Sequence, residues 1–198
     1  MLTVVTSAST YDLTILSTVK AELGITDRES DAALTGYIRQ ASDTVMKFCN
    51  RVFAPETVSE TFRLKCRTEE LVLTRIPVTA IGSVVENGET LDAADYELDA
   101  ENGALLRLCN DVEACWPRGK ITVVYTAGYE LLNGLPYGIE RAAILLVKQY
   151  ASAGDRDPMV RSEIVDGAGE TQYFAAADSG LPAEVEGLLL PHRLPIIR

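Results

Sequence analysis

The spacing of hydrophobic residues divides the chain into helical and extended regions. In residues 12–54, apolar side chains recur at intervals of three and four residues, as they do on one face of a helix. The clearest stripe consists of Leu34, Ile38, Ala41, Val45, Phe48 and Val52. At 100° per residue, these positions fall within about 80° of one another. We therefore expect a long helix there, preceded by a shorter helix that Asp12 caps and Gly24 ends.

Residues 57–127 show short alternating runs that are typical of β-strands. Asn87-Gly88 and Asn102-Gly103 lie between such runs. The Asn-Gly pair is typical of tight hairpin turns, because both of its positions accept positive φ angles. This region is predicted to be an antiparallel β subdomain that is inserted between helices.

Helical spacing returns in residues 135–152, and here the helix is apolar on two sides. One face carries Ile139, Ala142, Ala143, Leu146, Val147 and Tyr150. The opposite face carries two basic residues with two large apolar residues between them. A helix of this kind lies either at the centre of a fold or against another subunit. The predicted subunit interface on this second face is Arg141, Ile144, Leu145 and Lys148.

Residues 153–198 lose this regularity and are predicted to form an extended C-terminal arm, in which PAEVEGLLL is compatible with one or two further helical turns. The final segment, GLLLPHRLPIIR, is apolar, but its two prolines exclude a regular helix or a central strand. The whole pattern predicts the α+β class in a single domain of 198 residues. Its parts are a bundle-like helical core (12–54 and 135–152), the β insertion (57–127) and the arm.

Charge restricts the functions that the chain can have. With 29 acidic and 18 basic residues its net charge is −11, which argues against a general phosphate-binding surface. Seven carboxylates form an acidic stretch in residues 86–101, and residues 76–106 contain no Lys or Arg. The alternatives for this stretch are a solvent-exposed hairpin face, a surface facing DNA or a basic partner, and a site for a hard metal ion. Its members are Glu86, Glu89, Asp92, Asp95, Glu97, Asp99 and Glu101, of which Asp92, Asp95 and Glu101 are candidates for a DNA-facing position.

Catalytic patterns are missing from the sequence. It contains no nucleophile elbow, phosphate-binding loop, zinc-protease motif or dinucleotide-binding glycine motif. The one histidine, His192, stands beside Pro191 in the tail, and the four cysteines form no C-x-x-C pair. We therefore expect no catalytic residues, no cofactor and no metal. Because no apolar run is long enough to span a bilayer and the start does not resemble a signal peptide, we expect synthesis in the cytoplasm and no membrane contact.

Four segments of the sequence are not specific to a protein family one by one, but their order and spacing along the chain are. The first, VKAELGITDRESDAALTGYIRQASDTVMKFCNRVF, joins a short helix to a long one that closes on Arg51 and Phe53. The second is LVLTRIPVTAIGSVVENGETLDAADYELDAENGALLRL, the third is WPRGKITVVYTAGY followed by LPYGIERAAILLVKQY, and the fourth is LLLPHR. Together they resemble the head–tail connector, or adaptor, proteins of tailed bacteriophages and gene transfer agents, in the longer form with a β insertion. The sequence departs from the family's pattern at ASAGDRD and at His192, where an aromatic residue is common.

The resemblance implies a structural role. Such proteins form a ring, typically of twelve copies, beneath the portal, where it extends the DNA channel and supports the stopper or tail. We therefore expect a virion protein of the neck that is assembled in the host bacterial cytoplasm. Its expected partners are its own copies, the portal, and stopper or tail proteins. DNA is expected to pass through the lumen of the ring without specific binding. A stopper or tail-terminator ring protein is the nearest alternative, and a small metal-dependent enzyme using the acidic stretch is the alternative from another class.

The resemblance also implies a role for the end of the chain, because the family's C-terminal segment engages the portal. We predict a docking arm whose prolines reduce the entropy lost on binding, with a neighbouring subunit as the second choice of partner. The alternative is that the tail folds back on its own core. The predicted docking residues are Leu188, Leu189, Leu190, Pro191, His192, Arg193, Leu194, Pro195, Ile196 and Ile197.

Overall fold

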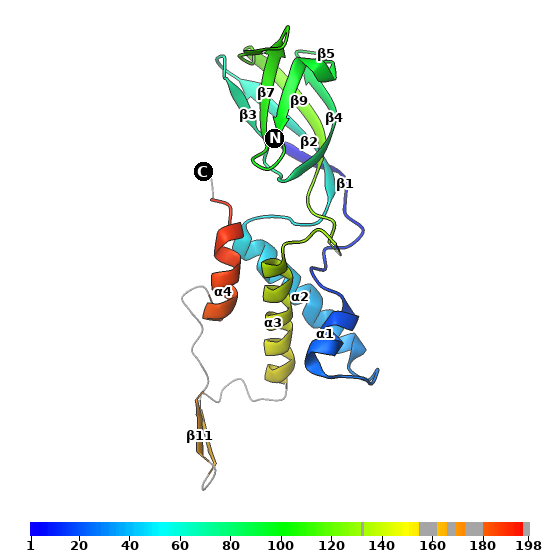
Figure 1. Cartoon of the computed structure of the whole chain (residues 1–198), viewed down its shortest axis with the longest axis vertical. Helices are drawn as coiled ribbons and strands as arrows, with labels where there is room; N and C mark the ends of the chain where they lie inside the picture. Colours follow the sequence, from blue (N-terminus) through cyan, green and yellow to red (C-terminus); the bar gives the residue numbers. More distant parts are fainter. Residues whose placement is uncertain (132, 155–161, 166–168, 173–179, 196–198) are drawn as a thin grey trace. The chain divides into compact units, whose positions relative to one another are not determined.

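The computed structural model divides the chain into two compact units (Figure 1). The first, called the β unit here, comprises Met1–Thr10 and Val52–Glu130. The second, the helical unit, comprises Tyr11–Arg51 and Leu131–Arg198. Helices and antiparallel sheets are both present, which confirms the predicted α+β class. The structure describes residues 1–131, 133–154, 162–165, 169–172 and 180–195.

The β unit contains two antiparallel sheets. The larger has the strand order β1-β2-β9-β4-β5, and the smaller has the order β3-β7-β6 with β8 paired to β7. A short 3₁₀ helix, η1 (Ala93–Asp95), precedes β6. The strands are β1 (Leu2–Thr6), β2 (Glu56–Leu64), β3 (Glu70–Val72), β4 (Val78–Glu86), β5 (Glu89–Thr90), β6 (Tyr96–Asp99), β7 (Ala104–Cys109), β8 (Val112–Ala114) and β9 (Gly119–Ala127). The sequence pattern did not predict β1, which pairs with β2 along the edge of the larger sheet.

Alternation along the strands builds the core of this unit. On β9, Ile121, Val123 and Tyr125 are buried while the residues between them are only half-buried. The smaller sheet contributes Leu71 from β3 and Leu105 from β7 to the same hydrophobic cluster. The core is therefore formed jointly by the two sheets, as period-two patterns predict.

The two Asn-Gly pairs form different turns. Asn87 and Gly88 have φ angles of 51° and 98°, which confirms the predicted tight turn between β4 and β5. In the second pair only Gly103 has a positive φ, of 69°, so the prediction of a second turn of this kind is wrong. The Asp99 carboxylate accepts hydrogen bonds from the backbone N–H groups of Glu101 and Asn102, and these bonds stabilise a longer turn instead.

The helical unit is organised around one central helix. Its elements are α1 (Leu16–Leu23), α2 (Asp31–Cys49), α3 (Tyr137–Gly154), α4 (Ala183–Leu189), the 3₁₀ helix η2 (Leu190–His192), and a hairpin of β10 (Ser162–Val165) and β11 (Gly169–Gln172). Helix α3 contacts α1, α2 and α4 (Figure 1). None of the helices among the described residues is both long and apolar enough to cross a membrane.

Two predicted helix boundaries need correction. Helix α1 begins at Leu16 rather than next to Asp12, because the preceding residues are tied to other helices. The N–H of Leu13 donates to Ser42 Oγ of α2 over 2.9 Å, and this bond holds Leu13 outside the helix. Helix α2 ends at Cys49, where Asn50 adopts the left-handed conformation, so Val52 is not part of its stripe. The rest of the stripe except the half-buried Phe48 is buried as predicted: Leu34, Ile38, Ala41 and Val45.

Candidate interaction surfaces

The C-terminal segment contacts its own helical unit as far as the structure describes it. Leu189 at the end of α4 is fully buried, and its carbonyl accepts a hydrogen bond from the Cys49 thiol over 3.9 Å. The N–H of Leu194 donates to the carbonyl of Cys49 over 2.9 Å. These are the contacts expected of the fold-back alternative. The predicted docking residues Ile196 and Ile197 lie outside the described residues.

Part of the same segment nevertheless stays exposed. Leu190 is 52% exposed, and Leu188 is less exposed than Leu190 but not buried. Tyr137, which begins α3, is 89% exposed, and the adjoining Gly138 lies close to the Leu188 carbonyl. We call the exposed side chains here the C-terminal patch, which consists of Tyr137, Leu190, Pro191, Arg193 and Pro195. It combines apolar side chains with one guanidinium group, a composition that is common in the centre of protein interfaces.

Burial sets the ionisation of the groups beneath this patch. It raises the pKa of the Cys49 thiol to about 11, although the charges of Arg51 and Arg193 oppose the shift. Burial, followed by the charge of Arg51, lowers the pKa of His192 from its ordinary value of 6.5. Arg193 lies over the ring of Phe48, with 5.1 Å between its guanidinium carbon and the ring centre. At neutral pH the thiol is therefore protonated and unreactive, and His192 is neutral.

The second face of α3 is covered in part within the chain itself. Ile144 is only 6% exposed, and α3 packs against α1 and α4 as well as α2. Arg141 forms an ion pair with Glu22 of α1 over 3.0 Å. Ile144 therefore belongs to the core of its own unit, and only Arg141, Leu145 and Lys148 keep exposed surface on the predicted interface. The sequence pattern predicted a subunit interface on this face because α4, which packs against α3, begins some 30 residues after α3 ends. The spacing of residues within α3 cannot show that α4 packs there.

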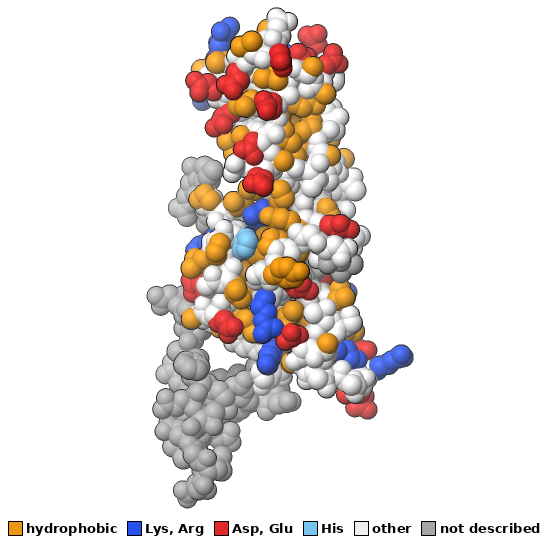
Figure 2. Space-filling view, in the orientation of Figure 1, with side chains coloured by type: hydrophobic (Ala, Val, Ile, Leu, Met, Phe, Trp, Pro, Cys, Tyr) orange, Lys and Arg blue, Asp and Glu red, His pale blue; other side chains and the backbone are white. Residues whose placement is uncertain are grey.

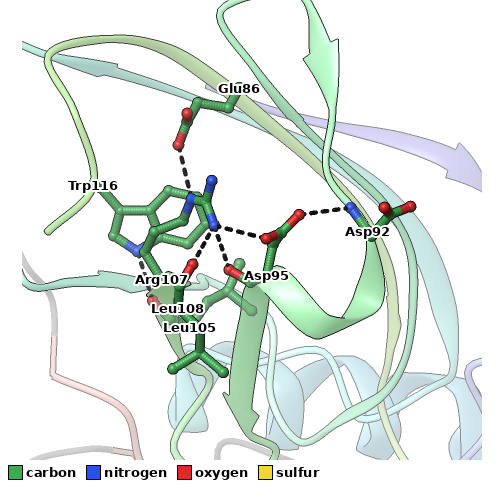
Figure 3. A network of polar contacts seen from close by, with 7 residues as sticks. All are labelled: Glu86, Asp92, Asp95, Leu105, Arg107, Leu108 and Trp116. Carbon is green, nitrogen blue, oxygen red and sulfur yellow. Dashed lines mark hydrogen bonds and ion pairs between the residues drawn. The ribbon is translucent and has the colours of Figure 1, made fainter. Parts of the chain in front are cut away.

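In the β unit, Arg107 organises the beginning of the acidic stretch (Figure 3). Its Nε donates to Glu86 over 3.2 Å, and its Nη1 donates to the Asp95 carbonyl over 2.8 Å and also to the Leu108 carbonyl. The Asp95 carboxylate lies 3.5 Å from the same nitrogen and accepts a bond from the N–H of Asp92. One guanidinium group thus neutralises two carboxylates and fixes η1 to β7. Sequence reasoning missed it because Arg107 stands just outside the acidic stretch.

The remaining carboxylates of the acidic stretch are exposed. They are Glu89, Asp92, Glu97, Asp99 and Glu101. Hydrogen bonds from the Asn102 side chain and backbone lower the pKa of Asp99. Of the three DNA-facing candidates, Asp92 and Glu101 are exposed, whereas Asp95 is half-buried by its contact with Arg107.

A second polar network lies deeper in this unit. The Glu60 carboxylate is 5% exposed and accepts hydrogen bonds from the Thr74 N–H over 3.0 Å and from the Tyr125 hydroxyl over 2.7 Å. The Tyr125 oxygen accepts a bond from the N–H of Arg75 over 3.1 Å, and burial raises the pKa of Tyr125 well above its ordinary value. The sequence feature that could have predicted this network is Glu60 itself, because it stands two residues after Val58 and therefore on the same inward-facing side of β2.

A hollow of about 410 Å³ lies in the β unit. It is lined by Glu69, Glu70, Leu106, Arg107, Glu113, Ala114 and Cys115. Across the described residues, no three His, Cys, Asp or Glu side chains gather in a way that could hold a metal ion.

The family assignment follows from a match that covers almost the whole chain. Residues 12–194 match the family of head completion proteins. The chain belongs to this family. No curated protein matches the sequence. Membership in the head completion protein family confirms the resemblance to phage connector proteins and the predicted class of function, a structural protein of the head–tail neck.

Solved structures share the fold. The chain is similar to a protein in the neck of an empty gene transfer agent particle computed with C6 symmetry, with a TM-score of 0.63 and 18% identity over 100% of this chain and 97% of that chain. It is also similar to chains in the neck of the native particle computed with C12 symmetry and in the native virion. Each of these matches has a TM-score of 0.62 and 20% identity over the same shares of the two chains.

Proposed function

We propose that this head completion protein is an adaptor subunit that forms a ring in the neck of a tailed phage or gene transfer agent particle. The observation that carries the proposal is the family match over residues 12–194. It is supported by the likeness to chains from necks that were computed with sixfold and twelvefold symmetry. The ring has twelve copies, lies below the portal, extends the DNA channel and supports the stopper or tail.

The C-terminal patch is the proposed contact with the portal. Leu190 and Tyr137 are large apolar side chains that the described part of the helical unit leaves exposed. Burying such a side chain contributes about 1.5–3 kcal/mol, so two of them can anchor a neighbour. Arg193 adds a donor that fits a carboxylate of the partner. The fold-back contacts at Cys49 hold the patch in place, so that it is presented as a preformed surface rather than as a free arm.

Surface charge suits a channel through which DNA moves. The net charge of −11 repels phosphate, which lets DNA pass without adhering to the wall. The half-exposed side of α3, with Arg141, Leu145 and Lys148, is proposed to face a neighbouring copy. No step of this function requires a cofactor or a catalytic group.

Attachment to heads tests the proposal directly. Purified protein is mixed with DNA-filled heads that carry a portal but lack a neck, and bound protein is quantified after sedimentation. The wild type is expected to bind in a fixed ratio to heads. Leu190→Asp should bind at least about tenfold more weakly, because a charge cannot be buried in an apolar contact without a large cost.

A matched control separates docking from general effects of the added charge. Val112, on β8, is 66% exposed, so Val112→Asp makes the same kind of change outside the patch. It should bind like the wild type. Equal binding by both variants would exclude the C-terminal patch as the portal contact. Binding only to heads that already carry another neck ring would instead identify a stopper or terminator.

A further inference from the structure

The positive charges of the β unit are concentrated at one place. This unit has 14 acidic and 7 basic residues. Two of the basic residues, Arg75 and Arg107, form ion pairs with carboxylates of the same unit. The other five lie where β2 ends and β9 begins, and we call them the basic end: Arg63, Lys65, Arg67, Arg118 and Lys120. All five are exposed, and none forms an ion pair with a described residue.

The strand register brings like charges together there. Arg63 lies directly opposite Lys120, on the same outward face where Thr61 and Thr122 hydrogen-bond to each other over 3.3 Å. The next pair in register, Leu64 and Gly119, ends the ladder, and Lys65 and Arg118 follow it immediately. Like charges opposite each other destabilise a sheet. A fold that keeps this arrangement without an internal carboxylate has positive charge available for an external anion.

The same unit carries a matching surface of opposite charge. The five exposed carboxylates of the acidic stretch follow the edge strands β5 and β6, whereas the basic end belongs to the interior strands β2 and β9. Figure 2 shows acidic side chains at several places on the face of the β unit that it draws. The acidic stretch adjoins the basic end at Asn87, whose side-chain oxygen accepts a hydrogen bond from the N–H of Lys120 over 2.9 Å. It reaches the opposite end of β4, where the carbonyl of Ala100 accepts a hydrogen bond from the N–H of Val78 over 2.8 Å. Its far part, with Asp99 and Glu101, is therefore a surface distinct from the basic end. A contact between distinct surfaces of identical copies repeats head to tail, and it closes into a ring when the rotation allows.

We propose that the basic end of one copy binds the acidic stretch of the next copy in the ring. This inference rests on the proposed function, because it specifies how neighbouring β units meet. Units that each carry a net charge of −7 repel one another, and they approach closely only if unlike patches face each other. The acidic stretch of a second copy supplies five exposed carboxylates for the basic end, and binding of DNA there is an outcome that the test below distinguishes.

Charge reversal on each surface tests this contact. One variant carries Arg63→Glu, Lys65→Glu and Lys120→Glu, and the other carries Glu89→Lys, Glu97→Lys and Glu101→Lys. Each should assemble about tenfold more weakly than the wild type in sedimentation velocity at 0.15 M salt, because like charges then face each other. The combination of all six substitutions restores opposite charges and should return assembly to the wild-type level. Circular dichroism on each variant checks that the subunit is folded.

The outcomes separate this inference from the proposed function. Failure of the wild type to form rings at any salt concentration would overturn the proposed function and this contact with it. Rings formed equally well by the wild type and both single-surface variants would overturn the contact alone. Weakened rings in both variants that the combined variant does not restore would also contradict it. Retention of a short DNA duplex that only the basic-end variant loses, with its rings intact, would reassign the basic end to DNA.

Discussion

The two units bury different kinds of polar groups. Among the residues that the structure describes, the buried polar ones of the helical unit are Thr14 and Ser42, both neutral hydroxyls, whereas those of the β unit are Glu56 and Glu60. A hydroxyl can be satisfied by one or two bonds from any nearby partner, but a buried carboxylate needs partners in fixed positions. The β unit therefore contains buried charged groups that need several donors, whereas the buried hydroxyls of the helical unit are neutral. The two units should respond differently to the loss of a single hydroxyl group.

The largest effect is expected for Tyr125→Phe in the β unit. The change removes the hydroxyl that donates to Glu60 and accepts from the N–H of Arg75, and leaves the carboxylate with fewer donors. We expect a loss of about 2–3 kcal/mol in the free energy of unfolding, as for hydrogen bonds to charged groups. Urea unfolding followed by the fluorescence of Trp116, the one tryptophan of the chain and a residue of this unit, measures it. Tyr137→Phe, at an exposed position, is the control and should change stability by less than about 0.5 kcal/mol.

A smaller effect is expected for Ser42→Ala in the helical unit. This change removes the oxygen that accepts from the N–H of Leu13, while the apolar stripe of α2 stays intact. The expected loss is about 1 kcal/mol, typical of a neutral hydrogen bond. Unfolding followed by helical circular dichroism measures it. A loss larger than that of Tyr125→Phe would contradict the contrast between the two units.

The smallest effect is a pH dependence that belongs to the helical unit. Burial and the charge of Arg51 lower the pKa of His192, so the folded state favours its neutral form. The stability linked to this residue is complete above its ordinary pKa of 6.5 and is lost as the pH falls through the lowered value. His192→Gln should therefore lose less in melting temperature than the wild type between pH 7 and pH 5. His192 is the one histidine of the chain. If the melting temperatures of the wild type and the variant fell equally, the pH dependence would therefore belong to carboxylates.

Local signals in the sequence predicted local structure well. The apolar stripe of α2 repeats within 12 residues, and its burial from Leu34 to Val45 follows from helical geometry alone. The turn at Asn87 and Gly88 needs only the two residues that form it. Features that depend on distant partners were missed or misplaced. Strand β1 needs β2, and the start of α1 depends on a bond to Ser42.

The candidate surfaces follow the same rule. The exposure of the acidic stretch was predictable, because so many carboxylates in a short segment cannot all be buried. The ion pairs of Arg107 with Glu86 and Asp95 were not predictable, because the pairing of strands, rather than closeness in the sequence, brings these residues together. The second apolar face of α3 suggested a neighbouring subunit, but burial of Ile144 depends on packing with helices far along the chain. The docking role of the C-terminal patch stays a prediction.

The pairing of β1 with β2 also constrains the order of events during synthesis. Leu2 pairs with Glu60, so β1 leaves the ribosome well before its partner strand exists. Until then the segment LTVVT, which has no charge and no proline, is an unpaired strand of the kind that self-associates. Helices α1 and α2 are made in the interval between the two strands. A nascent chain that stalls before β2 emerges is therefore expected to aggregate more readily than one in which β1 and β2 have paired.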